Sequence, residues 1–149
     1  MLHSATLTNI VIARDGEATA ERSLLASVVL LAVTDACAAP FKQKPTKIRQ
    51  RRKQRRMRRD AFTAMRFIFD ARVSGLETYA EWLDFDVDNF RTKLLAIMRN
   101  SGSLPINGFE PTKRIQFQRN YDMWFALKDL PDAIEQTEKN DDDDDDDES

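Results

Sequence analysis

The amino-acid sequence predicts an all-α protein built as a small helical bundle. Only four glycines and five prolines occur among its 149 residues, and a β architecture with many tight turns normally needs more of both. Apolar residues recur in several segments at the three- and four-residue spacing of a helix. A β-like alternation is confined to residues 7–12. Helices therefore account for most of the ordered chain.

Length and composition leave room for one domain with a modest core. Hydrophobic residues make up 42% of the chain, which argues against wholesale disorder. The single cysteine, Cys37, cannot form an intramolecular disulfide, and with His3 as the lone histidine a Cys/His catalytic pair or a multi-histidine metal site lacks its residues. No Gly-rich phosphate loop or nucleophile elbow occurs. The sequence predicts a non-enzymatic protein with no catalytic residues, metal or cofactor, in a reducing, intracellular setting.

The first two segments are an N-terminal arm and an apolar helix. Residues 1–20 form the arm, in which residues 7–12 fit either a brief strand or an extended stretch lying on the core. Residues 21–39 fit a helix with a wide apolar face that includes Leu24, Val28 and Leu31. Such a face has to be covered by the rest of the chain or by a partner, and a homodimer is one such partner.

The apolar run of residues 24–33 is not expected to enter a membrane. It is shorter than the roughly 20 apolar residues that span a bilayer. Three acids, Asp15, Glu17 and Glu21, precede it, and Asp35 lies inside the region that a signal peptidase would cut. We therefore expect neither a membrane partner nor a secretory signal.

Residues 40–59 are predicted to be a connector followed by a basic arm. Pro40 and Pro45 interrupt the helix. Between Lys42 and Arg59 eleven residues are basic and none is acidic. Two other interpretations of this run are a solvated helix face and a localisation signal. A solvated helix face normally mixes both signs of charge, so the run favours contact with the phosphates of nucleic acid over these interpretations. The predicted nucleic-acid-binding residues of the arm are Lys47, Arg49, Arg51, Arg52, Lys53, Arg55, Arg56, Arg58 and Arg59.

The basic segment, which we define as residues 47–59, is also expected to change on binding. Its residue types favour a helix, but like charges four residues apart repel one another, so we expect fraying in free solution and ordering against phosphates. The segment resembles the arginine-rich peptides of viral proteins, which implies RNA as much as DNA. Phosphate neutralisation does not depend on base identity, so both nucleic acids remain alternatives.

Residues 60–130 are predicted to form the helical core. An amphipathic helix continues from the basic segment with Phe62, Met65, Ile68 and Phe69 on its buried side, and Gly75 is the predicted C-terminal cap.

The rest of this core reads as three further helical segments. Residues 76–83 and 87–99 are two short helices joined by residues 84–86, and a loop after Asn100 leads to a last apolar segment, residues 115–130. The two tryptophans are expected to be core residues rather than platforms for stacked bases.

Residues 76–95 resemble the helix-turn-helix of small bacterial and phage regulatory proteins. Ala80 stands where that family has a small residue between its helices, and Asp84 stands at the turn position usually held by glycine, where aspartate can adopt the left-handed conformation. Further apolar contacts of the motif fall on Leu83, Phe85 and Phe90.

The resemblance implies that the second helix, residues 87–99, contacts DNA. Base reading would fall to residues beyond its first turn, namely Arg91, Thr92 and Leu95, with Lys93 beside them. Asp86 and Asp88 near the start would repel phosphates and are also natural helix caps. The alternative is therefore a helical hairpin of the bundle core that reads no DNA.

The stretch 83–95 is also similar to the ends of small phage-encoded proteins. This likeness implies a phage or prophage origin, and with the basic segment it implies a regulatory or genome-associated protein that binds DNA or RNA. The alternative is an interaction factor with a host or viral protein partner, such as an inhibitor of host machinery or a virion component. The location would be the bacterial cytoplasm for a phage protein, the nucleus for a eukaryotic one, or a virion.

Residues 131–149 are predicted to be a disordered acidic tail, since residues 141–148 are all acidic. The tail could keep the protein soluble, fold over the basic segment and mask it, or mimic nucleic acid on another protein. Masking is reasonable because two oppositely charged segments of one chain have a high effective concentration.

Overall fold

The structure, a computed structural model, describes residues 20–38, 46–73 and 75–130. Within these residues the chain forms five α-helices and one 3₁₀ turn, which confirms the all-α prediction. The elements are α2 (Ala20–Ala36), α3 (Ile48–Phe69), η1 (Ala71–Val73), α4 (Gly75–Leu83), α5 (Val87–Met98) and α6 (Pro111–Leu127). The N-terminal arm with its strand option, and the acidic tail, lie outside the described residues.

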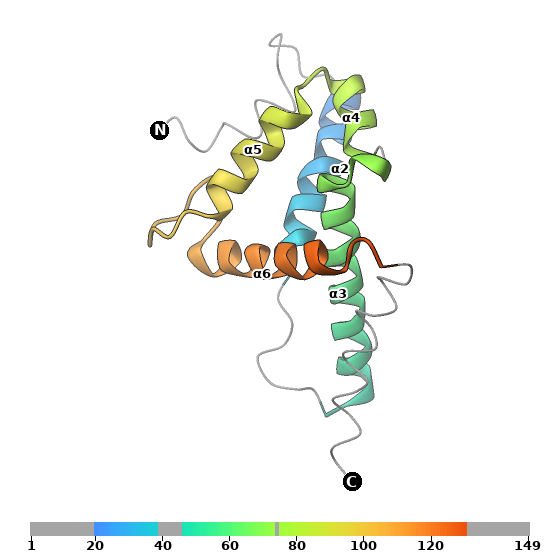
Figure 1. Cartoon of the computed structure of the whole chain (residues 1–149), viewed down its shortest axis with the longest axis vertical. Helices are drawn as coiled ribbons and strands as arrows, with labels where there is room; N and C mark the ends of the chain where they lie inside the picture. The colour runs from blue at the N-terminus through green and yellow to red at the C-terminus, as the bar shows by residue number, and fades with distance from the viewer. Residues whose placement is uncertain (1–19, 39–45, 74, 131–149) are drawn as a thin grey trace.

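The fold is built on an antiparallel pair of helices, α2 and α3 (Figure 1). α4 packs on α2 and α3 at the end where α3 finishes, and α6 crosses α3 near the level where α2 ends. α3 is the longer helix of the pair, so its N-terminal half continues past α6 and projects from the body of the molecule.

The core lies where the second half of α3 meets the other helices. α3 buries Ala61, Phe62, Ala64, Met65 and Ile68, the helical spacing that the sequence predicts. They pack with residues from each of the other four helices, including Val29, Val33, Leu76, Leu83, Phe90, Leu94, Phe117 and Trp124. Phe69 is half-buried and its ring meets Phe117 and Tyr121 of α6 edge to face.

The first correction concerns the end of α3. Gly75 is not the cap of this helix but the first residue of α4. α3 ends at Phe69 because Asp70 leaves the helical conformation and its carboxylate binds both the backbone N–H and the guanidinium of Arg72, at 3.0 Å each. Hydrogen bonds from Arg72 hold the pKa of Asp70 below its usual value. A Cβ atom on residue 75 would lie 2.5 Å from a ring atom of Phe67, so a larger residue there would force that ring to move.

The turn between α4 and α5 matches its prediction. Asp84 has a φ of 56°, the left-handed conformation. The N–H of Phe85 donates to the carbonyl of Ala80 at 3.1 Å, which closes α4 in the manner of a Schellman motif. The side chain of Asp86 then accepts from the N–H of Asn89 at 2.9 Å and caps α5.

Two polar side chains of α6 fix the position where this helix crosses the others. Arg114 is 1% exposed, and its guanidinium donates to four backbone carbonyls in the loop before α6, those of Asn100, Gly102, Leu104 and Phe109. These carbonyl dipoles replace the water that a buried cation loses. Asn120 donates to the carbonyls of Ala36 and Ala38 at 2.9 and 3.0 Å, which ties α6 to the end of α2.

Replacing Arg114 with leucine should lower the free energy of unfolding by about 2–4 kcal/mol, because four loop carbonyls lose the buried donor that holds them together. The matched control is Arg99→Leu, which removes an exposed arginine and should change stability by less than about 0.5 kcal/mol. Urea unfolding followed by circular dichroism measures both. Equal effects of the two substitutions would contradict the role assigned to Arg114.

Cys37 should be unreactive while the protein is folded. The thiol is 1% exposed at the end of α2, and burial raises its pKa to about 11, an effect that Lys113 partly opposes. At about pH 7.5 the thiolate fraction is then smaller than that of an exposed cysteine by a factor on the order of 100. Alkylation with iodoacetamide should therefore be slower than in urea by at least that factor. Rapid labelling of the native protein would show that this end of α2 is open.

Candidate nucleic-acid interface

The basic segment is the N-terminal half of α3 and not a separate arm. Lys47 is the extended residue just before the helix, and the following residues are helical from Ile48 onward. The structure describes a helix here, and the fraying that we expect in free solution stays a prediction. The packed half of α3 favours this helix, because forming the first turn is the costly step of helix formation and that half has already supplied it.

The side chains of this segment divide into two groups. Arg51, Arg55 and Arg58 are half-buried and continue the stripe that farther along holds Ala61 and Phe62. The exposed cations are Lys47, Arg49, Arg52, Lys53, Arg56 and Arg59. Twelve helical residues span about 18 Å, which matches roughly five nucleotide steps of one strand.

Acidic groups mark the end of this cationic surface. Asp60 is the first acid after the basic run, and it lies with Asp35 along a groove between α2 and α3 that also holds Val28, Leu31 and Phe67. The pKa of Asp35 is raised by burial and, to a smaller extent, by the charge of Asp60. Asp35 and Asp60 therefore share this groove, and Asp60 directly follows Arg59, the last cation of the basic segment.

Arg91 of α5 was predicted to contact DNA, and this prediction is corrected because its side chain stabilises the fold instead. Its Nε donates to the carbonyl of Ile68 and its Nη2 to Glu77 Oε1, both at 2.6 Å, and its side chain is only 16% exposed. Leu95 packs against the core. Thr92 and Lys93 are exposed on α5 and remain accessible to a ligand.

The two predicted parts of the interface do not form one surface, which is a second correction. In Figure 1 the basic segment and α5 lie on opposite sides of α6. The cause is the length of α3. Its 22 residues measure about 33 Å, the basic segment occupies its start, and α4 and α5 follow its end.

Four of the residues that carry the helix-turn-helix resemblance lie in the core of the structure. Ala80, Leu83, Phe85 and Phe90 are buried, and Asp86 has the capping role described above. Trp124 is in the core at 4% exposure, as expected, but Trp82 is 57% exposed, contrary to the prediction. Trp82 lies on the outer side of α4, where its ring meets only the edge of Tyr79.

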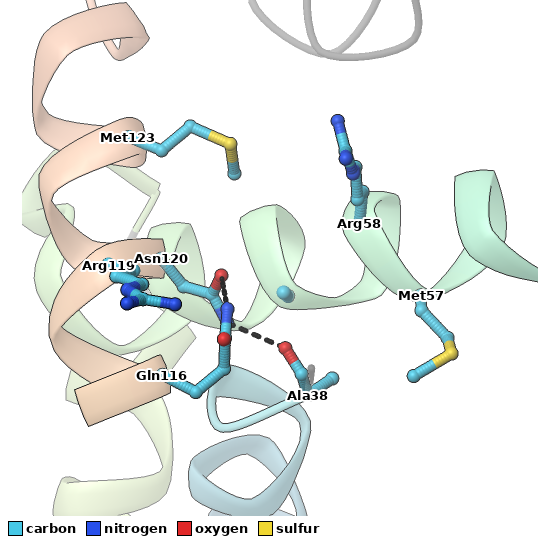
Figure 2. Close-up of a pocket in the computed structure, with 8 residues that line it drawn as sticks. Ala38, Met57, Arg58, Gln116, Arg119, Asn120 and Met123 are labelled. Atoms are coloured by element: carbon cyan, nitrogen blue, oxygen red, sulfur yellow. Dashed lines mark hydrogen bonds between the residues drawn. The ribbon is translucent and has the colours of Figure 1, made fainter. Parts of the chain in front are cut away.

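A pocket lies at the base of the basic segment, where α2 ends and α6 crosses α3. This α3–α6 pocket has a volume of about 240 Å³. Figure 2 shows Met123 extending from α6 toward α3, with Gln116 and Asn120 next to Ala38. Among the described residues that line it none is acidic; they are Ala38, Met57, Arg58, Ala61, Gln116, Arg119, Asn120 and Met123.

Sequence reasoning did not find the α6 residues of this pocket. Their signal was present, because Gln116, Arg119 and Asn120 interrupt an otherwise apolar last helix. Which helix they would face could not be inferred from their spacing.

A second pocket offers no chemistry of its own. It encloses about 700 Å³ beside the loop between α5 and α6. In the part of the chain that the structure describes, no lining residue of this pocket is titratable; the lining residues are Ala96, Ile97, Asn100, Gly102, Ser103, Leu104, Pro105 and Ile106. Among residues 20–38, 46–73 and 75–130, no group of three or more His, Cys, Asp or Glu side chains is arranged to hold a metal ion.

Within the same part of the chain, none of the helices combines the length and the apolar character needed to cross a bilayer.

Comparison of the chain with models of protein families, with curated proteins and with solved structures gave no match. The function must therefore be argued from the residues described above.

Proposed function

We propose that this chain is a non-enzymatic nucleic-acid-binding protein, of a phage-type regulatory or genome-associated kind, and that the basic segment binds the phosphate backbone. One observation carries the proposal. Nine of the 13 residues from Lys47 to Arg59 are cations with no acid among them, and all of them except Lys47 lie in a helix that projects past the body of the domain.

The geometry favours a linear polyanion as the ligand. Exposed guanidinium groups follow the helix for about 18 Å, and each phosphate they neutralise releases condensed counterions. The N-terminal end of a helix also carries a partial positive charge from its unpaired N–H groups. Here that charge adds to the cations, since no acid lies in the first turn of α3.

Backbone binding of this kind does not depend on base sequence. Any base reading by the pair α4 and α5 would have to come from Thr92 and Lys93, because Arg91 is bound to Glu77 and Ile68. These residues lie away from the basic segment. We therefore assign the main contact to α3 and treat α5 as a separate surface.

The test replaces the exposed cations Arg49, Arg52, Arg56 and Arg59 with glutamine, which keeps helix propensity. We expect affinity for an oligonucleotide of about 20 residues to fall at least about a hundredfold at roughly 50 mM salt, and the slope of log K against log salt to become shallower by about 3–4. Fluorescence anisotropy measures both, and circular dichroism checks that α3 remains helical.

The control variant removes positive charge elsewhere, at three other exposed cations: Arg66, Arg99 and Lys113. It should bind within a few-fold of the parent protein, because its charges lie off the proposed surface. Similar losses of oligonucleotide affinity in both variants would show that net charge alone governs binding. No loss of affinity in the first variant would show that the basic segment does not bind nucleic acid.

A protein-interaction role is the second candidate, and one observation favours it. Leu24, Val28 and Leu31 form a stripe along α2 in which they are 68%, 39% and 59% exposed, and the groove toward Phe67 continues it. The partner that we propose for this stripe is a second copy of the chain. An antiparallel copy would place Leu24 against Leu31 with Val28 at the twofold axis, so that apolar groups meet throughout.

If this stripe forms a dimer, light scattering should give twice the monomer mass, and Leu24→Glu with Leu31→Glu should return the protein to a monomer. Leu104→Glu, at a leucine that is 75% exposed but lies off α2, should leave the dimer intact. A monomeric parent protein at about 100 μM, a concentration at which a standard-sized interface is occupied, would reject this candidate.

A further inference from the structure

We propose that the α3–α6 pocket accepts one unstacked nucleobase, so that the protein prefers single-stranded nucleic acid to a duplex. The inference rests on the proposed binding of the phosphate backbone by the basic segment. It adds a ligand class that phosphate contacts alone do not specify.

The size and the walls of the pocket fit a base. Its volume of about 240 Å³ is below the roughly 300–1,000 Å³ of sites for drug-sized ligands, so it holds a small flat group. Met57, Met123 and Ala61 supply apolar walls, and methionine adapts its shape to a flat ligand. Arg119, whose side chain is exposed, adds a guanidinium group, and bases stack on such groups in single-stranded RNA recognition.

The pocket also contains an oriented amide. Both N–H groups of Asn120 are used by the carbonyls of Ala36 and Ala38, which leaves its oxygen to accept from Gln116 Nε2 at 3.0 Å. This bond fixes the Gln116 amide with its second N–H and its oxygen unpaired within the described residues. A neighbouring donor and acceptor of this kind is what glutamine uses to bind a base edge.

Position connects the pocket to the bound strand. Met57 and Arg58 belong to the basic segment itself, two residues and one residue before Arg59. They lie on the half-buried side of α3, so a strand bound at Arg56 and Arg59 reaches the pocket by crossing to the adjacent side of the helix. A base in a duplex must unpair and unstack before it can enter, whereas a base in a single strand is already accessible.

The experiment measures the dissociation constants for single-stranded and duplex oligonucleotides of about 20 nucleotides at one salt concentration. The parent protein should bind the single strand about tenfold more tightly, the effect of stacking one base. Gln116→Leu and Met123→Phe, made separately, should each remove most of this preference and leave duplex affinity within about twofold. Gln118→Leu, which alters a glutamine of α6 outside the pocket, is the matched control and should keep it.

A second measurement does not depend on oligonucleotide affinity. With methyl-labelled methionine, adenosine 5′-monophosphate should shift the NMR signals of Met57 and Met123, whereas inorganic phosphate at the same concentration should not. Equal shifts with both ligands would mean that the pocket binds only the anion and would overturn the proposal.

The outcomes also separate this inference from the proposed function. Equal affinity for single strand and duplex, with no change in either pocket variant, would reject the base pocket and leave backbone binding in place. Failure of the parent protein to bind either oligonucleotide would reject the proposed function, and the base pocket with it.

Discussion

The structure depends on one constraint, which is that a single helix serves both the core and the charged surface. The second half of α3 buries Phe62, Met65 and Ile68, and each such side chain contributes about 1.5–3 kcal/mol by leaving water. In the first half, cation pairs at four-residue spacing, such as Arg51 with Arg55, oppose the helix by only about 0.2–0.5 kcal/mol each. The packed half therefore fixes the direction in which the charged half projects. The charged half cannot change its direction without a change in the packing of the core.

The remaining helices are arranged around this one. α2 covers one side of α3 and stops at Cys37, and α6 crosses at that level because Asn120 caps the end of α2 and Arg114 folds the preceding loop. The crossing separates the packed body of the molecule from the basic segment. It also creates the pocket between Met57 and Met123, so the same contacts that stabilise α6 shape the proposed base site.

Local rules predicted the elements that depend on neighbouring residues. The bounds of α4 and α5 followed from helical periodicity to within one residue, and the left-handed conformation of Asp84 followed from the helix-turn-helix resemblance. Predictions that depended on distant residues failed. Arg91 was expected to face DNA. This prediction failed because its sequence neighbours do not reveal that Glu77 and the carbonyl of Ile68 lie within hydrogen-bond distance. Trp82 was expected in the core because its neighbours are apolar. The prediction failed because apolar composition does not tell which side of a short helix is covered.

The most direct measurement of the central claim is an NMR titration of the ¹⁵N-labelled protein with a short oligonucleotide. The account predicts amide shift changes concentrated at residues 48–61 and at the α6 residues of the pocket, with α5 unaffected. Changes confined to Thr92, Lys93 and the rest of α5, or no changes at all in dilute buffer, would contradict it.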